Sequence, residues 1–253
     1  MTLNRKLAPW PYPAVVAHRG GGALAPENTL AAFRTGARLG HSMVEFDAKL
    51  SRDDISFLLH DDSVERTSNG RGAAAALSYS ELAQLDAGSW FAAEFAGEPM
   101  PTLAAVAHAC RDLALAVNVE IKPCPGREGA TGQRVAQDVL RYWRDVAPAP
   151  LLSSFSYVAL AAAREAAPAL PRGLLFSALP TDWQAQAQSL ECISIHVAHR
   201  QLTAAQVDAI RSAGFRLMAY TVNDLQRAQE LLDWGVDAIC TDRIDLIGPD
   251  LKA

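Results

Sequence analysis

Residues 44–47 read Val44-Glu45-Phe46-Asp47, a pattern typical of a buried β-strand. Side chains two apart on a strand point to the same face, so Glu45 and Asp47 project together while Val44 and Phe46 pack on the other side. Adjacent carboxylates on a buried strand repel each other and need a neutralising partner, usually a divalent cation with oxygen ligands. An isolated pair of this kind also occurs on solvent-exposed edge strands, so the surrounding sequence must decide between the two interpretations.

Strands and helices alternate on both sides of this stretch, which predicts a parallel sheet covered by helices. A first strand at 14–17 precedes it, and a short charged turn after the strand at 43–50 predicts a hairpin to residues 55–59. Further strands are expected at 115–121, 151–155, 173–176, 192–196, 216–222 and 237–241. Helices are expected at 30–39, 101–111, 132–146, 157–167, 183–189, 203–213 and 224–234.

Eight βα units of this length predict a closed (β/α)₈ TIM barrel. The alternative is an open doubly wound sheet, but the first strand is not followed by the Gly-x-Gly-x-x-Gly pattern of dinucleotide-binding folds. Residues 61–100 interrupt the alternation with glycine, serine and an aromatic cluster at Trp90, Phe91 and Phe95. We therefore expect a single domain over residues 1–253, with an insertion at about 61–100 after the second strand and its hairpin.

The composition excludes several classes of partner. The chain has 253 residues and a net charge of −5 without a run of Lys or Arg, which disfavours a nucleic-acid or anionic-membrane surface. No apolar stretch approaches the length of a membrane span, and the N-terminal residues lack the apolar centre of a signal peptide. The four cysteines are scattered, as is usual for reduced thiols. We expect a cytoplasmic protein without stable membrane insertion, and the sequence leaves a homodimer open.

Polar residues gather where the expected strands end, the face at which barrels of this type place their active sites. These residues are His18, Arg19, Glu45, Asp47, His60, Glu120 and Lys122. Each has a structural explanation when taken alone: an imidazole can be a hydrogen-bonded core residue, and an acid beside a lysine can be an ion pair. Together they would carry a heavy desolvation penalty, so a functional site is the better interpretation.

This set of side chains suits the cleavage of a phosphodiester. Glu45, Asp47 and Glu120 can bind one divalent ion and leave positions open for substrate oxygens. The arginine and the lysine can neutralise a phosphate. His18 and His60 titrate near neutral pH and suit an acid and a base, although the sequence does not say which histidine has which role.

The chain resembles the glycerophosphodiester phosphodiesterase family over essentially its whole length, most closely the small cytoplasmic bacterial enzymes associated with glycerol 3-phosphate uptake. The motifs that carry the resemblance are His18-Arg19-Gly20, Pro26-Glu27-Asn28-Thr29, Glu45-Phe46-Asp47, His60-Asp61-Asp62, Glu120-Ile121-Lys122 and Thr241-Asp242. It implies hydrolysis of a small-molecule glycerophosphodiester to sn-glycerol 3-phosphate and an alcohol, and it allows a cyclic phosphate formed by attack of the glycerol 2-hydroxyl.

The resemblance also implies roles for these residues. It implies a divalent metal, Mg²⁺ or Ca²⁺, on the three carboxylates, acid and base roles for the two histidines, and phosphate contacts for Arg19 and Lys122. Many relatives have tryptophan at the position of Tyr220, whose ring can still line the mouth. Phe155, His196 and the insertion aromatics are further candidates for the walls around the glycerol and the head group, with core packing as the alternative for each.

Two other functions compete with this one. A related phospholipase-type barrel would act on intact lipids and would favour an exposed apolar rim or a secretion signal. A non-catalytic barrel that binds phosphate esters would be expected to have lost a metal ligand or a histidine, and this chain has all five residues. Neither the alcohol moiety nor the identity of the metal can be inferred from the sequence.

Overall fold

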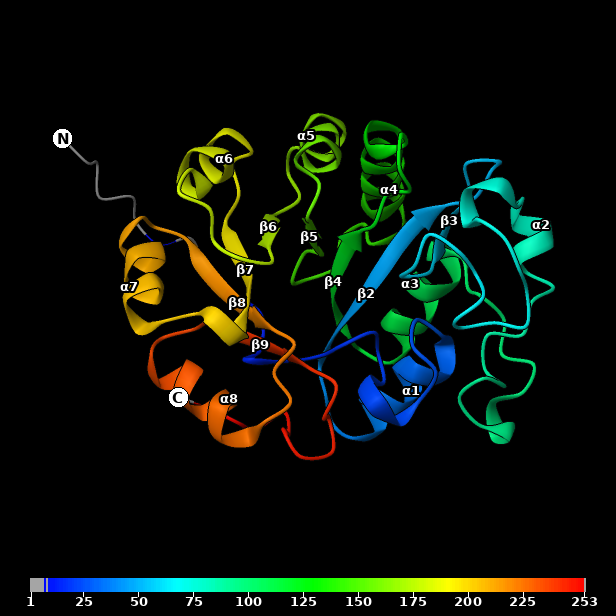
Figure 1. The fold of residues 1–253 in the computed structure, drawn as a ribbon, viewed down its shortest axis with the longest axis horizontal. Helices are drawn as coiled ribbons and strands as arrows, with labels where there is room; N and C mark the ends of the chain where they lie inside the picture. The colour runs from blue at the N-terminus through cyan, green and yellow to red at the C-terminus, as the bar shows by residue number, and fades with distance from the viewer. Residues whose placement is uncertain (1–6, 8, 253) are drawn as a thin grey trace.

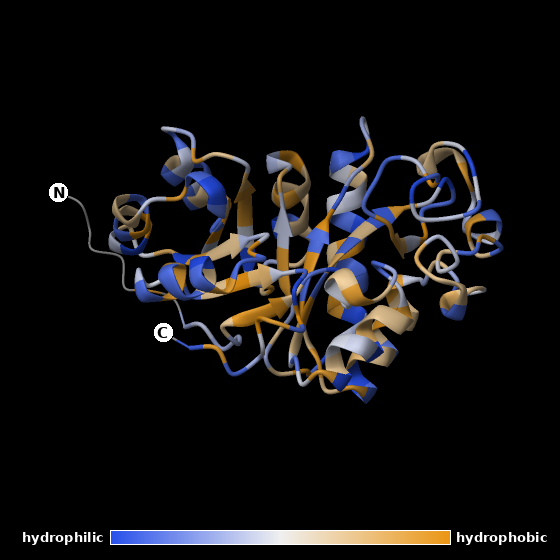
Figure 2. Ribbon diagram, turned by 60° about the horizontal axis from the view of Figure 1, so that its bottom comes forward, coloured by the Kyte–Doolittle hydropathy of each residue, from blue (hydrophilic) through white to orange (hydrophobic). Residues whose placement is uncertain are grey.

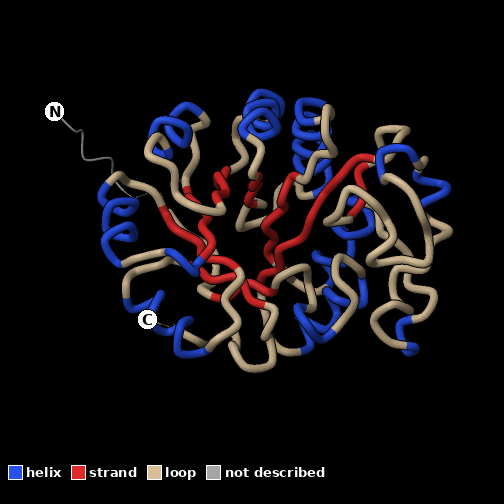
Figure 3. The backbone as a smooth tube through the Cα atoms, viewed as in Figure 1, coloured by secondary structure: helices blue, strands red, loops and turns tan. Residues whose placement is uncertain are grey.

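The computed structural model describes residues 7 and 9–252, and its centre is a closed parallel β-barrel (Figures 1 and 3). Strand β1 pairs with β2 on one side and with β9 on the other, which closes the sheet. The eight parallel strands are β1 (Val15–Ala17), β2 (Met43–Leu50), β4 (Ala116–Ile121), β5 (Leu151–Ser154), β6 (Arg172–Phe176), β7 (Ser194–Ala198), β8 (Arg216–Tyr220) and β9 (Ala238–Thr241). The expected (β/α)₈ barrel is confirmed.

Helices surround the barrel (Figure 3), and they follow one another in the order that the sequence predicts (Figure 1). They are α1 (Leu30–Arg38), α3 (Leu103–Asp112), α4 (Glu128–Tyr142), α5 (Tyr157–Ala166), α6 (Trp183–Ser189), α7 (Ala204–Ser212) and α8 (Leu225–Asp233). Most begin at a side-chain cap; for example, the hydroxyl of Thr29 accepts from the N–H of Ala32 at the start of α1. None of the described helices is both long enough and apolar enough to cross a bilayer.

Alternate residues of strand β2 face the barrel interior and the surrounding helices. All eight of its residues are buried, so the edge-strand interpretation of the Glu45 and Asp47 pair is wrong. Val44 and Phe46 face the helices, where the ring of Phe46 lies 5.5 Å from that of Phe33 and 6.5 Å from that of Trp143. The carboxylates project from the opposite face of the strand, into the barrel. Figure 2 shows the apolar strands that form this core.

The hairpin strand β3 (Ser56–Leu58) pairs antiparallel with β2 and leads out of the barrel. The following segment, up to α3, contains the 3₁₀ turns η2 (Ala74–Ala76) and η3 (Ala93–Phe95) and the short helix α2 (Tyr79–Leu82). It packs around its own buried cluster, which includes Phe57, Val64 and Leu82, and it lies beside β3 and α3 (Figure 1). Because β3 runs antiparallel to β2, this segment begins beside Asp47, whose carbonyl oxygen accepts from the N–H of Leu59.

Candidate active site

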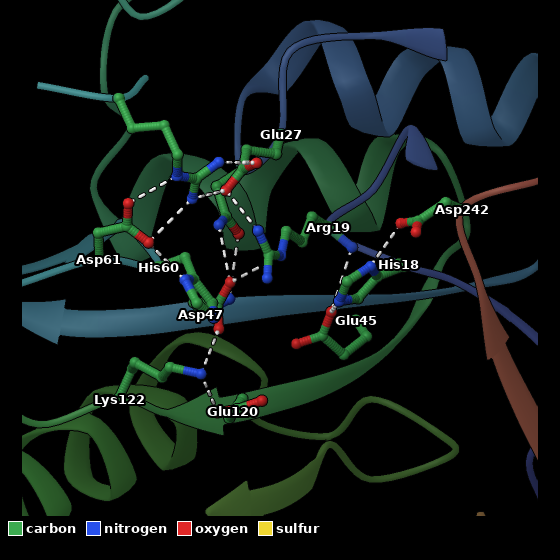
Figure 4. Close-up of polar contacts among 12 residues, drawn as sticks. His18, Arg19, Glu27, Glu45, Asp47, His60, Asp61, Glu120, Lys122 and Asp242 are labelled. Carbon is green, nitrogen blue, oxygen red and sulfur yellow. Dashed lines mark hydrogen bonds and ion pairs between the residues drawn. The ribbon is translucent and has the colours of Figure 1, made fainter. Parts of the chain in front are cut away.

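Three acidic side chains meet inside the barrel mouth (Figure 4). Glu45 and Asp47 come from β2, and Glu120 comes from the neighbouring strand β4, where it is the register partner of Asp47. Their exposed fractions are only 5, 1 and 8%, and each offers an oxygen that lies within 4.8 Å of the other two. Parallel pairing of two strands thus converts two short sequence motifs into one triangle of carboxylates.

The surroundings shift the pKa values of these three carboxyl groups in different directions. Burial, followed by the charge of Asp47, raises the pKa of Glu45 to about 8, and the same two causes raise the pKa of Glu120. Although burial alone would raise the pKa of Asp47, the charges of Arg19 and Lys122 lower it to about 2. The Oε1 atom of Glu45 is buried without a hydrogen-bond partner among the described residues. An oxygen-rich site with an unpaired carboxylate oxygen fits a hard divalent cation.

Two cations lie on either side of Asp47 (Figure 4). The Nε atom of Arg19 is 3.5 Å from Asp47 Oδ2, and Nζ of Lys122 is 3.5 Å from Asp47 Oδ1. Lys122 also donates to Glu120 Oε1 over 2.7 Å. The backbone N–H of Arg19 donates to Glu45 Oε2 over 3.1 Å. The site therefore presents fixed positive charge around its acids, as binding of a phosphate requires.

Each of the two histidines is held by a carboxylate on its Nδ1 atom. His18 Nδ1 lies 2.6 Å from Asp242 Oδ1, and His60 Nδ1 lies 2.6 Å from Asp61 Oδ1. Burial alone would lower the pKa of His18, but the Asp242 hydrogen bond and the charge of Glu45 raise it above its ordinary value. Burial is the main cause that lowers the pKa of His60. Neither Nε2 atom makes a hydrogen bond to another described residue, although His18 Nε2 lies 3.8 Å from Glu45 Oε2.

A second layer of polar residues supports this site, and the sequence analysis assigned none of them a role, although two of them, Glu27 and Asp61, belong to its motifs. Arg66 of the insertion donates to both carboxylate oxygens of Glu27 over 2.7 and 2.9 Å and to both oxygens of Asp61 over 2.6 and 2.9 Å. Glu27 in turn accepts from Arg19 over 2.7 Å. Arg66 thus joins the loop that carries Arg19 and Glu27 to the loop that carries His60 and Asp61.

Asn28 is another residue whose role the sequence analysis missed. Its Nδ2 donates to Asp47 Oδ2 over 2.9 Å, and its Oδ1 accepts from the backbone N–H of Asp47 over 3.0 Å. In the sequence Asn28 looks like part of a helix start, because it directly precedes the cap residue of α1. Its left-handed backbone, with φ of 60°, is what turns the amide toward β2. The one feature of the sequence that pointed to a role for Asn28 was its place in the Pro-Glu-Asn-Thr motif.

A cavity of about 500 Å³ opens beside His60, Glu120 and Lys122. Phe155 lines it and is 44% exposed, so the core-packing alternative for this residue is wrong. Its ring makes an edge contact with Tyr220 at 5.9 Å between centroids, and Tyr220 donates its hydroxyl to the carbonyl oxygen of Phe176. The structure therefore brings both aromatic candidates together, Phe155 at the rim of the cavity and Tyr220 behind it.

The other residues considered for the walls of the substrate site, His196 and the aromatic cluster of residues 90–95, do not line this cavity. His196 is buried inside the barrel, where its Nε2 is 3.0 Å from Ser194 Oγ and burial lowers its pKa to about 3. His196 is therefore a core histidine, in agreement with the alternative that it serves core packing. Trp90, Phe91 and Phe95 pack edge to face with one another inside the insertion, with centroids 5.6 Å apart for each successive pair. Neither group is among the residues that line the cavity.

Comparisons with known proteins agree with one another. The sequence profile of the "Glycerophosphoryl diester phosphodiesterase family" matches residues 18–246. A glycerophosphodiester phosphodiesterase of Caldanaerobacter subterraneus is 33% identical over 90% of this chain and 93% of its own. The structure of an Oleispira antarctica phosphodiesterase in complex with the product sn-glycerol-3-phosphate superposes with a TM-score of 0.90, at 37% identity over 93% of this chain and 95% of that one. A glycerophosphodiester phosphodiesterase of Agrobacterium tumefaciens superposes with a TM-score of 0.77, at 28% identity over 93% and 98%.

Proposed function

This chain belongs to the glycerophosphoryl diester phosphodiesterase family, and on that premise we propose that it hydrolyses glycerophosphodiesters to sn-glycerol 3-phosphate and an alcohol. The observation that carries the proposal is the convergence of three carboxylates, two carboxylate-held histidines and two cations on one barrel mouth. The product complex of the Oleispira antarctica relative supports the same products for this chain. A non-catalytic barrel would not need to keep all of these groups buried together.

A divalent ion, Mg²⁺ or Ca²⁺, on Glu45, Asp47 and Glu120 is the second part of the proposal. The buried, unpaired Oε1 of Glu45 and the short separations between the three acids support it. When bound, such an ion neutralises the acids and stabilises negative charge on phosphate oxygens. The two flanking cations, Arg19 and Lys122, then bind the remaining phosphate oxygens, the arginine through its planar fork and the lysine as a point charge.

The two histidines are proposed to move the protons of the reaction. In each ring the carboxylate on Nδ1 fixes the orientation and leaves Nε2 to face the phosphate. One Nε2 accepts the proton of the attacking hydroxyl, which belongs to water or to the glycerol 2-position, and the other donates a proton to the departing alcohol oxygen. Phe155 and Tyr220 form an apolar wall beside Lys122, which suits the carbon skeleton of the glycerol or of the alcohol.

Other parts of the sequence-based expectation remain predictions. We propose that the whole chain acts as one catalytic domain in which residues 61–100 form an insertion, because Arg66 of that segment contacts the loops of the site. Placement among the cytoplasmic uptake-associated enzymes, the cytoplasmic location and a homodimer rest on the sequence alone.

Release of glycerol 3-phosphate from glycerophosphocholine by the purified protein tests the proposal. We expect activity that is lost with EDTA and restored by Mg²⁺ or Ca²⁺, and loss of activity in Glu45→Gln. Glu165→Gln, at an exposed position on α5, is the matched control and should keep parent activity. Activity that resists the chelator would overturn the metal assignment, and a folded, metal-loaded protein that cleaves no glycerophosphodiester would overturn the function.

A further inference from the structure

Cys240 lies beside the catalytic groups, although the proposed reaction does not use it. It is buried on β9, the strand that pairs directly with β1, and His18 follows β1. Its Sγ atom, a ring nitrogen of His18 and a carboxylate oxygen of Glu45 all lie within 4.8 Å of one another. Three different donor atoms, one nitrogen, one oxygen and one sulfur, therefore converge on a single point of the barrel mouth.

His18 is presented in the way that metal-binding histidines usually are. Asp242 holds its Nδ1 at 2.6 Å, and Asn223 in turn donates to Asp242 Oδ2 over 2.9 Å. A carboxylate on one ring nitrogen is the outer-shell arrangement that fixes the tautomer and directs the lone pair of the other nitrogen toward a metal. That other nitrogen, Nε2, lies 3.8 Å from Glu45 Oε2.

Glu45 is the residue that the two clusters share. Its Oε2 atom accepts the backbone N–H of Arg19, whereas its Oε1 atom is buried and has no hydrogen-bond partner among the described residues. A buried carboxylate oxygen without a partner is costly unless a ligand completes it. Glu45 belongs both to the three-carboxylate cluster and to the cluster with His18 and Cys240. It is therefore the point at which two differently composed sites overlap.

The two clusters favour different ions. Hard cations such as Mg²⁺ and Ca²⁺ take oxygen ligands, whereas Zn²⁺ is bound by histidine nitrogen, thiolate sulfur and carboxylate oxygen with tetrahedral geometry. Tetrahedral bonds of the usual Zn²⁺ lengths place ligand atoms about 3.3–3.7 Å apart. The 3.8 Å between His18 Nε2 and Glu45 Oε2 is close to that separation. The Sγ atom of Cys240 belongs to the same group of donor atoms, all within 4.8 Å of one another, and would move closer to them on binding the ion.

We propose that His18, Glu45 and Cys240 form a second metal site, selective for a thiophilic ion such as Zn²⁺, and that its occupation switches the enzyme off. Binding replaces the S–H bond of Cys240 by a sulfur–zinc bond and releases the proton to solvent, so that a thiolate and a carboxylate balance the two positive charges. The lone pair of His18 Nε2 is then no longer available for proton transfer, and Glu45 is withdrawn from the three-carboxylate cluster. The inhibitory part of the proposal rests on the proposed function, whereas the metal site itself does not.

Co²⁺ is a spectroscopic probe for the metal site that requires no catalytic activity. A thiolate bound to Co²⁺ gives a charge-transfer absorption in the near ultraviolet, and we expect it when one equivalent of Co²⁺ is added to the parent protein. It should be absent in Cys240→Ser and retained in Cys110→Ser, which changes a buried cysteine of α3 outside this cluster. Should Cys240→Ser fold poorly, Cys240→Ala replaces it. Absence of the band in the parent, or its persistence without Cys240, would overturn the site.

Inhibition by Zn²⁺ at saturating Mg²⁺ tests the switch. We expect parent and Cys110→Ser to be inhibited alike, and the inhibition constant to weaken about tenfold or more in Cys240→Ser, since loss of even an outer-shell partner of a metal ligand costs that much. Equal inhibition of the parent and the Cys240 variant would overturn the switch. A charge-transfer band without any phosphodiesterase activity in Mg²⁺ would instead support the metal site and refute the proposed function, so the two failures are distinguishable.

Discussion

Asp242 is the residue whose hydrogen bond most strongly favours protonation of His18. Burial by itself lowers the pKa of His18, and the hydrogen bond that its ring makes to Asp242 is the largest opposing cause. In Asp242→Asn we expect a lower pKa for His18 and a kcat reduced at least about tenfold, because the asparagine no longer fixes the ring with a full charge. The pH–rate profile measures both effects.

Asp245→Asn provides the matched control for that experiment. Asp245 lies three residues further along the chain at an exposed position, where it pairs with Arg243. This variant should keep the parent profile. A parent-like profile and kcat in Asp242→Asn would show that His18 needs no charged partner.

Arg66 acts on the site through two other residues. Its bonds to Glu27 and Asp61 hold the partners of Arg19 and His60 in place, so Arg66→Met should weaken both substrate binding and turnover. We expect a higher KM together with a lower kcat, and partial recovery in Arg66→Lys, since lysine can bridge two acids but cannot donate two parallel bonds to each.

Arg71→Met is the matched control, because it removes a positive charge from the same segment. Arg71 is exposed and makes no bond to Glu27 or Asp61 in the described part of the chain, so this variant should keep the kcat and KM of the parent. If Arg66→Met changed only thermal stability and left kcat and KM as in the parent, its contribution would be to folding alone.

At the residue scale, most side chains of the site could be predicted from the sequence. The supporting residues that hydrogen-bond to them could not. The acids and Lys122 could be placed together because the ends of neighbouring parallel strands meet at one edge. Arg66 and Glu27 could not be placed beside these residues, because they lie in loops, and the sequence of a loop has no periodic pattern that predicts its course. The roles assigned to the site residues remain predictions until the variants are measured.

Among the helices, α4 and α5 make an unusually close contact that depends on one glycine. A Cβ atom at Gly132 would lie only 2.0 Å from the carbonyl oxygen of Ala159, which is backbone and cannot rotate away. Gly132→Ala should therefore destabilise the protein by about 1–3 kcal/mol through overpacking. Thermal melting at fixed metal concentration measures this as a loss of about 2–4 °C per kcal/mol.

Gly129→Ala is the control in the same helix. A Cβ atom there would meet nothing within 4 Å, so the substitution should be neutral or stabilise by up to about 1 kcal/mol through the better helix propensity of alanine. Opposite signs for the two variants would confirm the helix contact as the cause. Equal effects would mean that α4 can shift away from α5 at little cost.

The element scale also shows where periodicity fails. The hairpin between β2 and β3 agrees with the sequence prediction, because a charged turn joins two apolar runs. The range of α6, Trp183–Ser189, also agrees. Helix α4 was expected at 132–146 but spans Glu128–Tyr142. Its N-cap residue, Arg127, makes no side-chain cap bond, so no Ser, Thr or Asp marked the true start.

At the scale of the whole molecule, eight βα units were enough to predict closure of the barrel. Closure is what gathers groups from β1, β2, β4 and β9 in one mouth, although they are up to 224 residues apart in the sequence, as in the pair of His18 and Asp242. The course of residues 61–100 could not be predicted, because loops and short 3₁₀ turns leave no periodic pattern.

This concentration of charge should make the stability of the metal-free protein depend on pH. In the folded chain Glu45 has a pKa of about 8, against an ordinary pKa of 4.5 in the unfolded chain, so between these values the folded state binds more protons. Stability must then fall as pH rises across this window. His196, with its pKa lowered to about 3, acts in the opposite direction up to its unfolded value of 6.5. Only the difference between two proteins that share His196 isolates the contribution of Glu45.

Glu45→Gln provides that comparison, because it keeps the shape of the side chain and removes its titration. In EDTA, we expect the melting temperature of the parent relative to Glu45→Gln to decline steadily from about pH 4.5 to about pH 8. Saturating Mg²⁺ or Ca²⁺ should abolish the decline, since an ion on the three carboxylates favours their ionised forms. A difference that stays constant over this range in EDTA would show that solvent or a counter-ion already compensates the buried acid. A decline that persists with bound metal would place the ion elsewhere than on Glu45.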